Sequence, residues 1–128
     1  MKLFTKKQVV LPPSIKQVEE RRTLRIIRLQ GELNVSREPE INKFVRDFRS
    51  RPEFEFKNMI LDFKDVPYAD SSAVARLVQT MFDYKKAHHD LAIVNLNDTL
   101  RNVLEVMKID KLIRWYPSEE DAVKALSA

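Results

Sequence analysis

The chain has 128 residues, a length typical of one domain with a buried core. It is 44% hydrophobic and 33% charged, which is ordinary for a globular protein. The absence of cysteine excludes disulfides, thiol catalysis and cysteine-based zinc sites. The single glycine, Gly31, excludes the glycine-rich phosphate-binding loops of many nucleotide-dependent enzymes.

The hydropathy pattern contains no membrane or secretory signal. No apolar run in the sequence approaches the ~20 residues that are needed to cross a bilayer. Residues 1–7 contain too few apolar side chains for the hydrophobic region of a secretory signal peptide. We therefore expect a cytoplasmic protein that has no membrane partner.

The net charge of +4 raises the question of an acidic partner such as a nucleic acid. The densest basic stretch follows two glutamates and contains Arg21, Arg22, Arg25 and Arg28. No aromatic residues interleave with these arginines in the manner of a base-stacking surface. We therefore favour a solvated strand face and expect no nucleic-acid partner, with a basic binding surface as the alternative.

The first part of the chain predicts an extension, two strands and a helix. Residues 1–13 form an N-terminal extension that ends in two prolines, and residues 8–11 within it could pair as an edge strand. Residues 14–20 alternate weakly and residues 23–30 predict a clearer strand, which a turn at 31–34 follows. A first helix begins near Glu38 and ends before Pro52, because its apolar residues recur at i, i+3, i+4 and i+7.

Strands and helices alternate through the rest of the chain. We predict strands at 58–63, 91–94 and 112–116, and helices at 71–87, from Asn97 or Asp98 onward, and at 122–126 after a capping box at 118–121. Such alternation implies an α/β domain whose strands pair mostly in parallel. Functional loops in such sheets lie at the carboxyl ends of the strands.

The segment Asp70-Ser71-Ser72-Ala73 lies at such a strand end, where a helix begins. Backbone N–H groups without intrahelical partners surround a helix N-terminus and favour negative charge. A serine there can be phosphorylated, and the phosphate would meet hydrogen-bond donors. Aspartate and serine are also common helix N-caps, so the same residues could serve only as a cap.

Four segments resemble STAS domains, the family of bacterial anti-sigma factor antagonists. Residues 31–34 resemble the family's G-E-L-D turn, and residues 61–73 resemble its L-D-x to D-S-S-G strand-to-helix junction. Residues 91–104 and 109–122 resemble the strand-and-helix segment and the ending of the family. The resemblance covers about residues 23–126. It implies an α/β STAS-like single domain at 14–128, with a mixed four- to five-stranded sheet and about four helices.

The resemblance also implies a switch at Ser71. In that family a cognate serine kinase of the histidine-kinase-like ATPase type, which is also the anti-sigma factor, phosphorylates the first serine. The unphosphorylated antagonist binds this kinase and frees sigma, and a serine phosphatase reverses the modification. Asp70 would then shape the junction and Ser72 would be a neighbouring cap, while Ala73 and Asn34 replace the family's glycine and aspartate.

Partner contacts are expected around this junction and on the second helix, each with mere solvation as the ordinary alternative. The candidates are Asn34, Ser36, Ala73, Arg76, Gln79, Thr80 and Asp83. We predict no catalytic residues, no cofactor and no metal, because the adjacent histidines His88 and His89 would point in different directions. A STAS scaffold in another signalling or lipid-transport complex is the other alternative that the resemblance allows.

Overall fold

The structure is a computed structural model that describes residues 13–34 and 57–127. Its centre is one five-stranded sheet in the order β1-β2-β3-β4-β5. The strands are β1 (Ile15–Glu20), β2 (Leu24–Gln30), β3 (Asn58–Asp65), β4 (Leu91–Val94) and β5 (Trp115–Tyr116). Only β1 is antiparallel to its neighbour, and the pairs β2–β3, β3–β4 and β4–β5 are parallel. The mixed α/β sheet predicted from the sequence is therefore confirmed.

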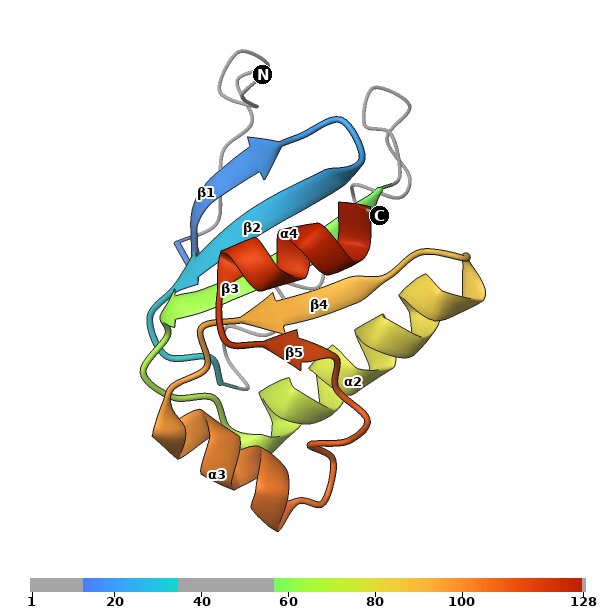
Figure 1. The fold of residues 1–128 in the computed structure, drawn as a ribbon. Coiled ribbons are helices and arrows are strands. Elements are labelled where there is room, and N and C mark those ends of the chain that lie inside the picture. Colours follow the sequence, from blue (N-terminus) through green and yellow to red (C-terminus); the bar gives the residue numbers. More distant parts are fainter. Residues whose placement is uncertain (1–12, 35–56, 128) are drawn as a thin grey trace.

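Helices cover both faces of the sheet. Figure 1 shows α4 (Glu119–Ser127) lying across one face, where its Ala122 and Leu126 pack with Ile26, Ile60 and Val94. The buried residues of α2 (Ser71–Lys86) and α3 (Asp98–Val106) belong to the larger core on the other face. Central strands that are covered on both sides read as nearly continuous apolar runs, which is the pattern of β3 and β4.

The helices present the stripes that periodicity predicts. Val74 and Met81 of α2 are buried, whereas Leu77 and Val78 of the same stripe are only partly buried. Leu100 and Leu104 of α3 are buried, with Val103 and Met107 partly buried beside them. The second and third predicted helices thus agree with the structure to within about a residue, the usual uncertainty of helix ends.

Two predicted elements at the C-terminal end need correction. The last strand is only Trp115–Tyr116, because Leu112 lies in a turn and its N–H donates to the Ile109 carbonyl (2.9 Å). The final helix begins earlier than predicted, at Glu119, because the Ser118 hydroxyl accepts from the Asp121 N–H (3.2 Å) and caps it. The described residues contain three helices; the predicted first helix, residues 8–11 and Ser36 lie outside them.

The turn predicted at 31–34 is present. Gly31 has a φ of 79°, a left-handed value that glycine adopts without steric cost. Its N–H donates to the Asp65 carbonyl (2.9 Å), which ends the pairing of β2 with β3. The turn therefore directs the chain toward the end of β3, where the β3–α2 loop begins.

Candidate functional site

The candidate site is the β3–α2 junction, and the turn at 31–34 forms backbone hydrogen bonds with this junction. Leu33 forms an isolated parallel bridge with Ala69 of the junction. Its N–H donates to the Tyr68 carbonyl (2.9 Å), and its carbonyl accepts from the Asp70 N–H (3.0 Å). The fold therefore brings together the two motif segments, 31–34 and 70–73, that are separate in the sequence.

Asp70 is the N-cap of α2. Its backbone is extended (φ −79°, ψ 172°), and its side-chain Oδ1 accepts from the Ala73 N–H (2.9 Å). Ser71 is consequently the first helical residue, and both Ser71 and Ser72 are exposed. The expectation that Ser72 caps the helix is wrong, because the helix has one N-cap position and Asp70 occupies it. The hydroxyl of Ser71 is thus presented to solvent at the helix N-terminus.

The candidate contact residues of α2 differ in exposure. Arg76 and Gln79 are exposed, and Thr80 and Asp83 are partly buried. The Gln79 side chain donates to Asp83 (3.1 Å), and the Thr80 hydroxyl donates to the Arg76 carbonyl (3.0 Å). These four side chains recur at i, i+3, i+4 and i+7 and therefore share one face of α2, which Ser72, four residues before Arg76, also joins.

Two further candidates near the junction are less accessible. Asn34 is partly buried beside Leu33. Ala73 is buried, with 9% of its surface exposed, and its backbone N–H bonds to Asp70. Ala73 therefore packs into the core and offers a partner almost no surface, which corrects its place among the candidate contacts.

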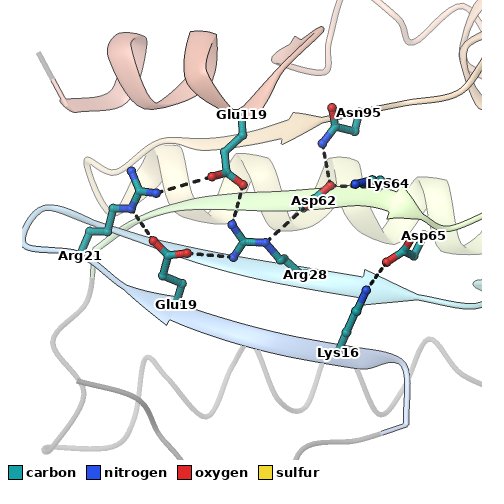
Figure 2. Close-up of polar contacts among 9 residues, drawn as sticks. All are labelled: Lys16, Glu19, Arg21, Arg28, Asp62, Lys64, Asp65, Asn95 and Glu119. Atoms are coloured by element: carbon teal, nitrogen blue, oxygen red, sulfur yellow. Dashed lines mark hydrogen bonds and ion pairs between the residues drawn. The ribbon is translucent and has the colours of Figure 1, made fainter. Parts of the chain in front are cut away.

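The arginine stretch is not the solvated strand face that the sequence analysis favoured. Figure 2 shows Arg28 of β2 between three carboxylates from three other elements. Its guanidinium lies 2.7 Å from Glu119, 3.1 Å from Glu19 and 3.7 Å from Asp62. Arg21 also pairs with Glu19 (2.6 Å) and Glu119 (3.5 Å).

Arg25 is likewise inside the protein, with 1% of its side chain exposed, and it pairs with Glu20, which Lys57 also contacts (2.9 Å). Arg22 remains exposed. Most of the positive charge of this stretch is therefore compensated within the fold, which argues against a basic surface for nucleic acid. Sequence spacing alone missed this, because Glu119 is distant in the chain.

The network sets the protonation of one of its carboxyls. Burial raises the pKa of Glu19, but hydrogen bonds and charge from Arg21 and Arg28 outweigh burial and lower the pKa below its ordinary value. Glu19 is consequently ionised at neutral pH, as an ion-pair partner must be. On the outer side, Lys16 pairs with Asp65 (2.8 Å) and lowers the pKa of that exposed carboxyl.

The described residues give no indication of metal chemistry or of a membrane span. No group of three or more histidine, aspartate or glutamate side chains in the described ranges could hold a metal ion. His88 is exposed with a φ of 62°, and the His89 ring lies 2.9 Å from the Ala87 carbonyl. No helix of the described part is long and apolar enough to cross a bilayer.

Comparison with solved structures identifies the fold. A Thermotoga maritima protein described as an anti-sigma factor antagonist superposes with a TM-score of 0.76 at 18% identity, over 87% of this chain and 93% of that one. The unphosphorylated form of the anti-sigma factor antagonist SpoIIAA gives 0.64 at 21% identity, over 88% and 97%. A murine anion transporter of solute carrier family 26 gives 0.72 at 18% identity, over 85% of this chain but only 18% of the transporter.

Sequence comparison gives the family. Comparison with curated proteins finds no significant match. The family model of the STAS domain matches residues 16–122, which include the Gly31–Asn34 turn, the Asp70–Ala73 junction and the start of α4 up to Ala122. Order of elements, sheet topology and sequence motifs therefore agree, and the chain belongs to the STAS domain family.

Proposed function

We propose that this chain is an anti-sigma factor antagonist whose binding is switched by phosphorylation of Ser71. The single observation that carries the proposal is the position of Ser71. It is an exposed hydroxyl at the first residue of α2, beside the N-cap Asp70 and after the carboxyl end of β3 in the parallel part of the mixed sheet. SpoIIAA, one of the similar structures described above, is an anti-sigma factor antagonist, which supports this function over the other uses of the fold.

The physical basis of the switch is a change of charge at an interface. A phosphate adds about −1.5 to −2 charges near neutral pH. At the centre of an interface it repels acidic groups of the partner and must lose its hydration. Disturbing such a buried polar position costs about 2–4 kcal/mol of binding free energy, which is a loss of affinity of about 30- to 1000-fold. The exposed side chains of Arg76 and Gln79, further along α2, would supply specificity.

The proposed partners follow from this assignment. In its unphosphorylated form the protein binds a serine kinase of the histidine-kinase-like ATPase type that also holds sigma, and a serine phosphatase restores this form. The protein itself is a cytoplasmic binding module without enzymatic activity. A STAS module in a transporter or another signalling complex is the second candidate, because the similarity to the anion transporter is nearly as close in geometry.

The test combines modification and binding. The purified chain is incubated with ATP and each kinase of this type from the source genome, and the modified peptide is identified by mass spectrometry. We expect one phosphate, on Ser71. Modification confined to Ser72 or Ser118 would contradict the assignment.

Titration calorimetry with the same kinase then measures the switch. Ser71→Ala should bind as tightly as the unmodified chain and should not be inactivated by ATP. Ser71→Asp should bind more weakly, although one carboxylate has less charge than a phosphate. Ser72→Ala is the matched control and should behave as the wild type. Equal binding by all three folded variants would show that Ser71 is not a switch.

A further inference from the structure

The β3–α2 loop contains carbonyl groups that the sheet does not use. Pairing of β3 with β2 ends at Asp65, and the chain continues through Val66 and Pro67 toward Ser71. Val66 is 1% exposed, and proline has no backbone N–H with which to extend a ladder. Buried carbonyls almost always have a hydrogen-bond partner, so the Val66 carbonyl requires a donor from elsewhere in the fold, whereas Pro67 is exposed.

Asn97 provides the donor from the next crossover of the sheet. Its side-chain Oδ1 accepts from the Leu100 N–H (2.8 Å) and caps α3. Its amide Nδ2 lies 3.2 Å from the Pro67 carbonyl and 3.4 Å from the Val66 carbonyl. One side chain therefore joins the start of α3 to the start of the loop that leads to Ser71.

The opposite end of the same loop is held by Leu33. Its N–H bonds to the Tyr68 carbonyl and its carbonyl to the Asp70 N–H. Asn97 at Pro67 and Leu33 at Tyr68 thus act on adjacent residues from two different segments. Loss of either contact would allow the loop more conformations and would leave Asp70 less well placed to cap α2.

We propose that Asn97 is a positioning residue that fixes the β3–α2 loop and thereby the presentation of Ser71. Capping alone does not require asparagine, because serine and aspartate cap as well. Asparagine also has an amide group that can donate hydrogen bonds to the loop. An ionised carboxylate has no hydrogen to donate, and the side chain of serine is too short for its hydroxyl to reach the loop. The consequence for phosphorylation rests on the proposed function, whereas the contact with the loop does not.

The test separates capping from positioning by substitution. Asn97→Ser and Asn97→Asp both keep an oxygen that can cap α3, and both remove the amide donor. Asp98→Asn is the matched control, because Asp98 lies next to Asn97 and its side chain is 94% exposed. Amide hydrogen exchange is measured on each full-length chain by NMR, together with its denaturation midpoint.

We expect the amides of Asp70 and Ala73 to exchange about three- to tenfold faster in both Asn97 variants, which corresponds to the loss of one net hydrogen bond. The Leu100 and Arg101 amides of α3 should keep their protection, because the cap is retained. The control should match the wild type at all four amides. If Asp70 and Ala73 exchange at the wild-type rate in both Asn97 variants, the proposal is overturned.

A kinase assay extends the test to function. Where a kinase modifies Ser71 of the wild type, its kcat/KM for Asn97→Ser should fall by about the same three- to tenfold factor under conditions in which the denaturation curve shows the variant to be fully folded. An undiminished kcat/KM would overturn the positioning role. Faster loop exchange without any modification of the wild type would support the contact and contradict only the proposed function.

Discussion

The Arg28 network makes the sharpest prediction for stability. Substitution of Arg28 by methionine keeps much of the aliphatic side chain but removes the cation that three carboxylates share. The side chains of Arg28, Glu19 and Asp62 are only 21%, 16% and 8% exposed, so water cannot fully replace the lost partner. Breaking a fully buried ion pair costs about 3–5 kcal/mol of unfolding free energy.

The expected cost here is smaller than that limit. Glu19 and Glu119 each keep Arg21 as a second cation, and Asp62 keeps its hydrogen bonds from Asn95 (2.9 Å) and the Lys64 N–H (2.9 Å). We therefore expect Arg28→Met to lower the free energy of unfolding by about 2–3 kcal/mol, since the sites are partly solvated and partly compensated.

Urea denaturation followed by circular dichroism measures the change, with Arg22→Met as the matched control. Arg22 is exposed, so its substitution should stay within about 0.5 kcal/mol of the wild type. The slope of the free energy against urea should be unchanged in both variants if only stability differs. If both substitutions change the free energy of unfolding by the same small amount, the reasoning is refuted and the arginines form a solvated strand face, as the sequence analysis favoured.

Three more expectations concern the core, the cap and pH. Leu104→Ala should cost about 2–5 kcal/mol in urea denaturation, whereas Val106→Ala, at a side chain that is 81% exposed, should cost less than about 0.5 kcal/mol, and similar costs would mean that α3 is wrongly oriented. Asp70→Ala should lose about 1 kcal/mol of cap stabilisation, as seen in thermal unfolding, and no loss would contradict the cap. Because the folded state lowers the pKa of Glu19, its ion pairs stabilise the protein above the unfolded pKa and lose this contribution as pH falls through the lowered folded value. The stability difference between wild type and Glu19→Gln should therefore shrink on acidification below about pH 4.5, and a constant difference would exclude this linkage.

Much of the fold follows from local patterns in the chain. Apolar runs placed β3 and β4, because strands covered on both faces need apolar residues at nearly every position. Stripes at i, i+3, i+4 and i+7 placed α2 and α3, because only one face of each helix meets the core. The Asp-Ser-Ser junction could also be predicted from a local pattern, because an N-cap side chain bonds to a backbone N–H only two or three residues further along the chain.

Other features depend on contacts that sequence spacing does not encode. The last predicted strand is shortened to Trp115–Tyr116, because pairing needs a neighbouring strand and β4 offers partners only at Ile93 and Val94. The isolated β-bridge between Leu33 and Ala69 is a tertiary contact that the sequence of residues 31–34 does not predict.

The sequence by itself determined the family, the alternation of strands and helices, and Ser71 as the candidate switch residue. Only the tertiary structure decided which residues surround Ser71 and which carboxylates pair with the arginines of β2 and its flanking turn. Asp70 takes the cap and leaves Ser71 exposed, and Asn97 reaches the loop from another crossover. Arg28 is not a solvated charge, because folding brings Glu119 to 2.7 Å from it across the sheet face. Periodicity reports which side of an element is buried, whereas the partners of a polar side chain are set by distant segments that only folding brings within hydrogen-bonding distance.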